Sequence, residues 1–331
     1  MSRVAAVAVL AAVVLAVPAP ALADPAGPTD YRTDILSVEP AIDGLEIRML
    51  AGDSFMEVTA PAGATILVTG YRGEPYLRFE PDGTVLENRL APTAYLNIDR
   101  YGEVEVPPEA DPRATPDWVE VATDGRYAWH DHRTHWMNPD PPPGAEPGDT
   151  ILEAVVPLVV DATPVTVTVQ STWVDPPSPW ASSLGFFVGL VGALTAVRLL
   201  RPEPMLRGLL LVASAAALAM GVWERLSMPP EAAATLLVVL LPVGGLLFGW
   251  FVKTGSPIAG MAASFAAAHL LVWVGFRWQV MIEPILPTDA PWALDRFVTA
   301  FVAAVAAVAL VQSLRLVFGP APGDAEGAAP A

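Results

Sequence analysis

Hydrophobic and polar residues alternate with a period of two along much of the first half of this chain. The clearest stretch sets valines against polar residues at every second position: Val165, Val167 and Val169 against Thr166, Thr168 and Gln170. Such alternation is typical of β-strands with one buried face. Turn residues such as those at 61–63 separate the alternating segments. The pattern between residues 35 and 174 predicts seven to nine short strands in an antiparallel, immunoglobulin-like β-sandwich.

Two long polar stretches interrupt the predicted strands. The stretches 88–117 and 138–149 are rich in proline, glycine and charged residues, so both are predicted to be loops. The segments predicted as strands are 44–50, 55–59, 65–69, 74–79, 84–87, 151–160 and 165–173.

A different pattern begins after residue 179, where polar positions become rare. Five apolar stretches follow, each close to the ~20 residues that an α-helix needs to cross a bilayer. Core helices of a soluble domain would show a polar face, and these stretches barely do. They predict a five-helix transmembrane domain, which makes the chain an α+β multidomain protein. The stretches span 180–200, 205–223, 234–252, 257–276 and 297–317.

The start of the chain has the pattern of a signal peptide. Arg3 precedes an apolar run, and Ala21-Leu22-Ala23 matches the small-x-small cleavage site. Cleavage there would make Asp24 the first residue of the mature protein, and an uncleaved anchor is the alternative. The predicted division is a signal peptide (1–23), an extracytoplasmic β-domain (24–175), a proline-rich linker (176–179), a transmembrane domain (180–318) and a disordered cytoplasmic tail (319–331).

Acidic charge is concentrated in the predicted β-domain and its linker. Residues 24–179 hold 27 acidic and nine basic residues, and the whole chain has a net charge of −17. An acidic surface repels nucleic acid, which excludes nucleic acid as a partner, and it gathers cations. The positive-inside tendency predicts a multi-pass protein of the cell membrane with its N-terminal domain outside the cell. The basic residues at the predicted cytoplasmic helix ends are Arg198, Arg201, Arg207, Lys253 and Arg315.

Three of the four histidines lie within six residues. His130, His132 and His135 share the stretch 127–137 with Asp131 and Met137. Imidazole, carboxylate and thioether groups are ligands for transition metals. The chain has no cysteine, which excludes thiolate ligands, and an exported site with a methionine favours copper over zinc. On a strand His130 and His132 would share one face, whereas His135 would join them only through a turn or bulge near residues 133–134, or if the whole stretch were a loop.

The same stretch also has a structural interpretation. Trp129 and Trp136 bracket the histidines and can exclude water or fill a core. Asp131 and Arg133 can pair with each other while the imidazoles bond backbone carbonyls. A hydrolytic zinc site is a third alternative, but no general base with suitable reach is identified. The sequence lacks the motifs of common enzyme classes, so it predicts no catalytic residue and no enzyme activity.

The fourth histidine, His269, lies near the middle of the fourth apolar stretch. Ionisable side chains at that depth are costly and often functional. His269 either serves transport or bonds a neighbouring helix as a neutral ring. Two glycine patterns predict close helix packing, namely Gly185-x-x-x-Gly189 and Gly245-x-x-x-Gly249. A stripe in the second stretch can pass a soft cation or arise by chance: Met220, Glu224 and Met228.

The stretch 129–137 resembles an uncharacterised family of exported actinobacterial membrane proteins that carry the motif Trp-His-Asp-His-Arg-x-His-Trp-Met. The similarity includes the segments 74–79 and 95–97 and covers most of the β-domain. The family implies export and membrane anchoring but brings no established function. The layout is also similar to that of CopC–CopD copper-handling proteins. CopC-type sites use a histidine at the mature N-terminus, where this chain has Asp24, so that similarity is limited to layout.

These patterns predict a membrane-anchored extracytoplasmic binding protein that captures or passes a transition metal, with copper as the expected cofactor. The alternative is a non-enzymatic envelope interaction or scaffold protein whose His/Trp cluster is structural. The expected partners are the lipid bilayer and either a metal ion or other envelope proteins. The predicted metal ligands are His130, His132, His135, Met137 and Asp131, with Trp129, Trp136, Arg133 and His269 as further site residues.

Overall fold

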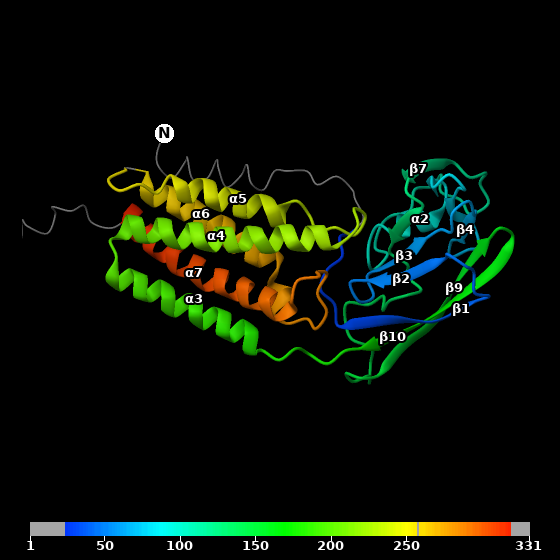
Figure 1. Ribbon diagram of the computed structural model, residues 1–331, viewed down its shortest axis with the longest axis horizontal. Helices are drawn as coiled ribbons and strands as arrows, with labels where there is room; N and C mark the ends of the chain where they lie inside the picture. Colours follow the sequence, from blue (N-terminus) through cyan, green and yellow to red (C-terminus); the bar gives the residue numbers. More distant parts are fainter. Residues whose placement is uncertain (1–23, 257, 319–331) are drawn as a thin grey trace, which may run out of the picture.

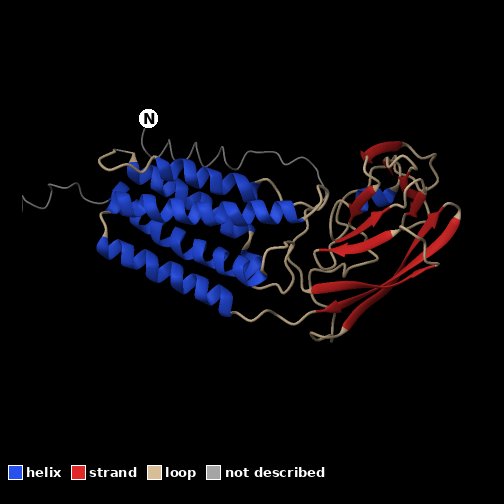
Figure 2. Ribbon diagram, viewed as in Figure 1, coloured by secondary structure: helices blue, strands red, loops and turns tan. Residues whose placement is uncertain are grey.

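The computed structural model describes residues 24–256 and 258–318 (Figure 1). The predicted signal peptide, 1–23, and the predicted tail, 319–331, lie outside these residues. All strands precede residue 174 and all long helices follow residue 179, so the chain has an α+β architecture (Figure 2). We refer to residues 24–175 as the β-region and to residues 176–318 as the helical region.

Ten strands form two antiparallel sheets in the β-region. One sheet has seven strands in the order β1-β10-β9-β4-β5-β6-β7, and the other has three in the order β2-β3-β8. The count exceeds the prediction partly because the edge strand β7 exposes Val119 and alternates weakly. The strands are β1 (Tyr31–Glu39), β2 (Glu46–Leu50), β3 (Phe55–Thr59), β4 (Ile66–Thr69), β5 (Pro75–Phe79), β6 (Val85–Asn88), β7 (Trp118–Ala122), β8 (Arg126–Trp129), β9 (Thr150–Val160) and β10 (Thr163–Trp173).

The two sheets share one hydrophobic cluster. Met56 and Trp129 of the small sheet belong to the same buried cluster as Phe79, Leu158 and Val167 of the large sheet. The predicted apolar face of β10 is confirmed, because its alternate valines are all buried. An immunoglobulin constant domain pairs four strands with three. The seven and three strands observed here do not confirm the immunoglobulin-like part of the prediction.

The two longest strands form a hairpin with a two-residue turn. β9 and β10 pair in antiparallel register along their length. Asp161 and Ala162 in the turn have φ values of 46° and 66°. Positive φ at both positions is the requirement of a type I′ turn, whose twist matches that of the paired strands. The strands predicted on either side of this turn are confirmed.

The described residues contain six α-helices rather than the five predicted, because a short helix, α2, also forms in the β-region. Four are long and apolar enough to cross a membrane: α3, α4, α6 and α7. The predicted span 234–252 is helical over only 14 residues in α5, about 21 Å against a hydrocarbon core of about 30 Å. The helices are α2 (Pro92–Leu96), α3 (Trp180–Leu199), α4 (Pro202–Ser227), α5 (Leu237–Trp250), α6 (Ala259–Phe276) and α7 (Trp292–Phe318), with a 3₁₀ turn, η1, at Trp278–Met281.

Glycines allow the long helices to approach closely. A Cβ atom added at Gly189 on α3 would lie 2.7 Å from the carbonyl oxygen of Phe301 on α7. A Cβ at Gly249 on α5 would lie 3.5 Å from the Cβ of Leu210 on α4. Their partners Gly185 and Gly245 face the same two helices. Both predicted Gly-x-x-x-Gly patterns therefore lie at helix contacts.

The β-region is bonded to the connections at one end of the helical region (Figure 1). The backbone N–H of Ala26 donates to the carbonyl of Ala232, between α4 and α5, at 3.0 Å. Thr29 and Ile285, which lies between η1 and α7, exchange two backbone hydrogen bonds of 3.1 and 3.2 Å. We call this contact the seam, and it lies beside the predicted histidine site.

Candidate functional site

The three clustered histidines lie on a turn that directly follows β8. The backbone N–H of Thr134 donates to the carbonyl of Asp131 at 2.8 Å, and the Thr134 hydroxyl donates to the same oxygen at 2.7 Å. Thr33 on β1 donates its hydroxyl to the carbonyl of Thr134 at 2.6 Å, which holds the turn against the large sheet. The strand on which His130 and His132 would share one face ends before them, at Trp129, so that condition is not met.

The turn brings His135 to the centre of the cluster. The ring centroid of His135 lies 5.4 Å from that of His132 and 6.2 Å from that of His130. Both pairs meet edge to face. The sequence interpretation required a turn or bulge near residues 133–134, or a loop throughout, for three histidines to meet, and the structure has a turn there. His135 is thus the shared neighbour, where His130 and His132 were expected to be the core pair.

Each of the three histidines has a ring nitrogen within hydrogen-bond distance of a backbone carbonyl oxygen. Nε2 of His132 lies 2.9 Å from the carbonyl oxygen of Asp99, and Nδ1 of His135 lies 3.2 Å from that of Trp136. In a neutral imidazole one nitrogen donates and the other keeps a lone pair. Donation to these carbonyls therefore places the lone pairs on Nδ1 of His132 and Nε2 of His135.

Both nitrogens of His130 face carbonyl oxygens. Nδ1 lies 2.6 Å from the oxygen of Ser54, and Nε2 lies 2.9 Å from that of Asp24. Two such bonds can form together only in the imidazolium form, but burial lowers the pKa of His130 to about 4. We conclude that desolvation prevails and the ring is neutral near pH 7. The shorter distance assigns its single proton to Nδ1.

Burial also lowers the pKa of the other two imidazoles. Desolvation is the main cause for both His132 and His135, and the nearby Arg100 guanidinium adds to it. Arg100 is itself paired with the buried Asp53 carboxylate at 2.6 Å. The cluster therefore consists of neutral rings, and the Arg100 charge beside them is compensated by Asp53.

The Asp131 carboxylate is fully engaged away from the imidazoles. Its relative exposure is 0%. Arg133 donates to it through Nε at 2.8 Å and through a terminal nitrogen at 2.6 Å, and the Trp129 indole N–H donates at 3.0 Å. The guanidinium of Arg133 also lies over the ring of Tyr71, whose hydroxyl accepts from the backbone N–H of His132. These are the contacts expected in the structural interpretation.

The remaining residues of the motif have separate roles. Trp129 is buried in the core shared by the sheets, whereas Trp136 lines a cavity and donates its indole N–H to the Asp140 carbonyl at 2.8 Å. A Cβ at Gly102 would lie 3.0 Å from a ring carbon of His132 and 3.5 Å from the methyl carbon of Met137. Gly102 thus lies beside both side chains.

Within the described part of the chain, no three His, Cys, Asp or Glu side chains are arranged to hold a metal ion. One atom of the cluster is nevertheless unused. Nε2 of His135 is buried and has no hydrogen-bond partner among the described residues, and the whole residue is 1% exposed. Histidines that bind metals typically donate their other ring N–H to a backbone carbonyl. His132 and His135 both have that arrangement.

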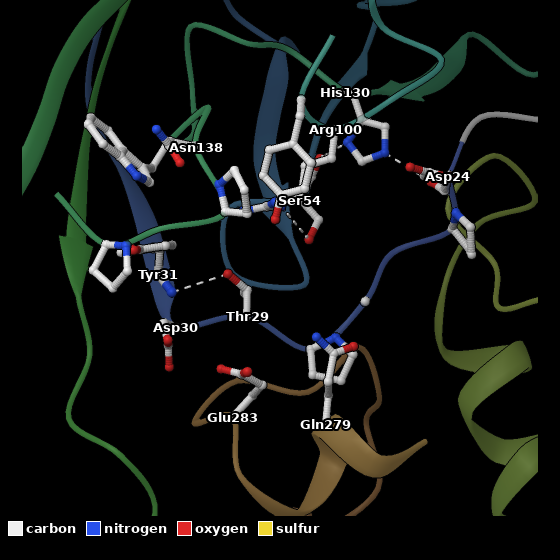
Figure 3. Close-up of a pocket in the computed structure, with 17 residues that line it drawn as sticks. Asp24, Thr29, Asp30, Tyr31, Ser54, Arg100, His130, Asn138, Gln279 and Glu283 are labelled. Carbon is white, nitrogen blue, oxygen red and sulfur yellow. Dashed lines mark hydrogen bonds between the residues drawn. The ribbon is translucent and has the colours of Figure 1, made fainter. Parts of the chain in front are cut away.

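A cavity of about 350 Å³ lies at the seam beside His130 (Figure 3). It is lined from the β-region by Asp24, Asp30 and His130 and from the helical region by Gln279 and Glu283. Burial, followed by the neighbouring Asp30 carboxyl, raises the pKa of Glu283 to about 7. Burial and then Asp99 raise the pKa of Asp24. The cavity is therefore polar and acidic, and both regions contribute to it.

His269 is bonded within its own helix. Its Nδ1 lies 2.8 Å from the carbonyl oxygen of Phe265, one turn earlier on α6. The ring packs on Phe248 of α5, with centroids 5.3 Å apart, and a Cβ at Gly244 would lie 2.9 Å from its Nε2. The structure therefore places His269 at a tight α5–α6 contact, well separated in the sequence from the histidine cluster.

The buried charged residues of the helical region gather at the end next to the seam. Arg277, after α6, pairs with Glu224 of α4 and donates to Asp295 of α7 at 2.6 Å. Its guanidinium lies over the ring of Trp273 at 5.0 Å. Arg296 donates to the carbonyls of Glu283 and Pro284. Glu224, the acidic member of the stripe of Met220, Glu224 and Met228, is thus part of a buried ion pair.

Sequence reasoning did not identify several partners of the histidine cluster. Asp24, Ser54 and Asp99 contribute backbone carbonyls to it, and any residue type can supply a carbonyl. Their side chains therefore held no signal of this role. The Asp53–Arg100 pair offered a weak signal, since arginine is scarce in this acidic region.

The chain was compared with protein families, curated proteins and solved structures. No family model matches it, and neither a curated protein nor a solved structure matches it. The resemblance to exported actinobacterial membrane proteins therefore stays a prediction.

Proposed function

We propose that this protein is a non-enzymatic, membrane-anchored binding or interaction protein of the cell envelope, in which the histidine cluster is structural. One observation carries the proposal: the imidazoles bond backbone carbonyls while Asp131 pairs with Arg133. Those carbonyls belong to separate segments, at Ser54, Asp99 and Trp136. The cluster thus ties the turn after β8 to the β2–β3 turn and to the loop after α2.

The β-region lies outside the cell in this proposal, with its two sheets enclosing the core as a β-sandwich. The connections that it contacts, α4–α5 and α6–α7, carry Glu231, Glu283 and Asp289 against a single basic residue, Arg277. Arg201 and Lys253 lie in the α3–α4 and α5–α6 connections, at the opposite helix ends (Figure 1). The positive-inside tendency assigns those ends to the cytoplasm. α5 completes its crossing with the non-helical residues that flank it, so the chain crosses five times.

Reporter fusions test this sidedness. A reporter after Phe318 should report the cytoplasm, and one after Pro230, at the seam, should report the exterior. A reversed pair of signals, or both reporters on one side, would contradict the orientation.

Stability measurements test the structural role of the cluster. His130→Ala should lower the free energy of unfolding of the full-length protein by about 2–4 kcal/mol, since it removes a buried ring and its hydrogen bond. The loss should be equal with chelator and with added Cu(II) or Zn(II). His269→Ala, a histidine outside the cluster, is the matched control. An unchanged stability in His130→Ala would refute the structural role.

A transition-metal site is the second candidate function, and the unpartnered Nε2 of His135 favours it. The 5.4 Å between the rings of His132 and His135 suits two imidazoles on one ion, with Met137 near Gly102 as a further donor. Copper suits that donor set. His130 would join only after its Nε2 leaves the Asp24 carbonyl.

Calorimetric titration of the full-length protein with Cu(II), Cu(I) and Zn(II) decides between the candidates. If the cluster binds metal, the wild type should bind one of these ions tightly and in a defined stoichiometry. The double variant His132→Ala/His135→Ala should lose this binding, and His269→Ala should keep it. Equal, weak heats for all three ions in the wild type and the folded double variant would exclude the metal candidate.

A further inference from the structure

A second cavity, of about 390 Å³, lies on the other side of His130 and is lined by aromatic side chains. Tyr76 of β5, Tyr95 of α2, and Tyr127 and Trp129 of β8 contribute rings to it. The Tyr76 and Trp129 rings meet edge to face with centroids 6.5 Å apart. The volume falls in the range of about 300–1,000 Å³ that is typical of small-molecule sites.

Carboxyl groups from both regions line the same cavity. Glu87 comes from β6, and Glu231 comes from the α4–α5 connection at the seam. Burial raises the pKa of Glu87 to about 7 and also raises that of Glu231. Arg89 lines the cavity as well, but its guanidinium pairs with Asp117. The cavity lining thus contains two carboxyl groups and one guanidinium that is already paired.

One buried polar group in this wall has an unused donor. Asn97 is 4% exposed, and its Oδ1 accepts from the Tyr71 hydroxyl. Its Nδ2, although buried, has no hydrogen-bond partner within the ranges that the structure describes. A buried donor without a partner costs about 1–3 kcal/mol. A ligand oxygen in the cavity would satisfy it.

We propose that this cavity binds an organic cation of the alkylammonium class, with the ammonium group among the aromatic rings and near Glu87 and Glu231. Ammonium groups bind the faces of Trp and Tyr rings through cation–π attraction, which is strengthened when water is excluded. The carboxyl groups complement the charge, and Asn97 donates to an oxygen near the ammonium group. The inference deepens the proposed function and rests on it, since it names the ligand class of an envelope binding protein.

Two sources can supply such a group: a free molecule such as choline, or the headgroup of a choline lipid at the membrane surface. The Glu231 side of the cavity belongs to a helix connection, so a headgroup has access from the seam. The chemistry is shared, and the experiment separates the sources.

Calorimetry on the full-length protein tests the proposal. The protein is placed in nanodiscs of phosphatidylglycerol and titrated with choline, with tetramethylammonium, and with the neutral isostere of choline in which carbon replaces nitrogen. We expect both cations to bind at least about tenfold more tightly than the isostere. Nanodiscs that contain phosphatidylcholine should suppress choline binding if the lipid headgroup is the natural occupant, and should leave it unchanged if a free molecule is.

Matched variants assign the binding to this cavity. Glu87→Gln should weaken choline about tenfold, whereas Glu120→Gln makes the same chemical change at an exposed position of the adjacent strand β7 and should bind like the wild type. Tyr127→Leu should weaken choline, and Tyr127→Phe, which keeps the ring, should not. If Tyr127→Leu does not fold, the two glutamate variants still decide.

Two results would overturn the inference: equal affinity for choline and its neutral isostere, or equal choline affinity in Glu87→Gln and Glu120→Gln. Such a failure leaves the proposed function intact if His130→Ala still destabilises the protein and the Pro230 reporter is external. Conversely, if choline binds but the reporter fused after Pro230 lies in the cytoplasm, the ligand inference stands and only the assignment to the cell envelope is rejected.

Discussion

The β-region and the helical region each bury a polar cluster near the seam, but they satisfy these clusters by different means. In the β-region, neutral imidazoles of His130, His132 and His135 bond to backbone carbonyls of loops. In the helical region, the Arg277 guanidinium is balanced by the carboxylates of Glu224 and Asp295.

The difference follows from the backbone that surrounds each cluster. Loop carbonyls are free of ladder bonds and can accept from a ring N–H, whereas a helix carbonyl is already bonded along the helix and offers only its second lone pair, as Phe265 does to His269. Arg277 carries a full buried charge and needs an opposite charge, whereas the neutral imidazoles do not. We infer that removing a partner costs more in the helical region than in the β-region.

Arg277→Met should produce the largest effect. It leaves Glu224 and Asp295 buried without their cation, and losing one partner of a buried ion pair costs about 3–5 kcal/mol. Thermal unfolding in nanodiscs measures the loss. Arg198→Met, the same change at an exposed helix end, is the control and should stay near the wild type. Equal stability of the two variants would contradict the charge balance described for α4, α6 and α7.

Asp131→Asn should produce the next largest effect. The amide cannot match the charge-assisted bonds to Arg133 and the Trp129 indole, and such bonds contribute about 1.5–3 kcal/mol each. We expect a loss of about 2–3 kcal/mol in chemical denaturation. Asp124→Asn, on an exposed turn nearby, is the control. If Asp131→Asn is as stable as that control, the engagement of Asp131 contributes no net stability.

The raised pKa of Glu87 predicts how the stability of the β-region depends on pH. Its pKa of about 7 lies above the ordinary value of 4.5, so the folded state holds the proton more tightly. The stabilisation is complete below about pH 4.5 and is lost as pH rises through 7. Allowing for partial exposure, we expect stability to fall by about 1–2 kcal/mol across that window.

The variant Glu87→Gln isolates this contribution. The groups that face Glu87 are the Tyr76 and Tyr127 rings, Arg89 and Glu231. The slope of stability against pH should flatten in Glu87→Gln and persist in the control Glu120→Gln. A slope that persists equally in both variants would assign the pH dependence to another group.

His269→Ala should produce the smallest effect, a loss of about 1 kcal/mol, which is the scale of one polar contact between helices. The ring bonds within α6 and packs on Phe248, so its loss leaves no buried charge. Thermal unfolding and protein abundance measure this. If the variant keeps its stability but abolishes movement of an ion, His269 serves transport.

The parts of the fold that repeat a pattern could be predicted from the sequence. Alternating valines predicted β10 together with its buried face, and four of the five apolar stretches are helices of membrane-spanning length. α5 was overestimated because hydropathy does not locate helix ends: at the start of the predicted span the Ala234 carbonyl accepts from the Arg225 guanidinium instead of opening the helix.

The histidine site could be predicted as a location but not as a geometry. The sequence identified the turn residues, and it stated both the metal and the structural alternatives. It could not predict that His135 is the central ring, because the parity of a strand does not apply beyond Trp129. Nor could it show which carbonyls face the rings, since these depend on the packing of distant loops.

The seam has a mechanical consequence. The β-region is attached to the helices at three places: the proline-rich linker into α3, the Ala26–Ala232 bond and the Thr29–Ile285 pair. A body held by one tether can swivel, whereas three separate attachments restrain tilt as well as distance. The β-region therefore keeps a fixed orientation relative to the helix axes. A shift of α4 or α7 along its own axis would tilt the entire β-region rather than stretch a linker.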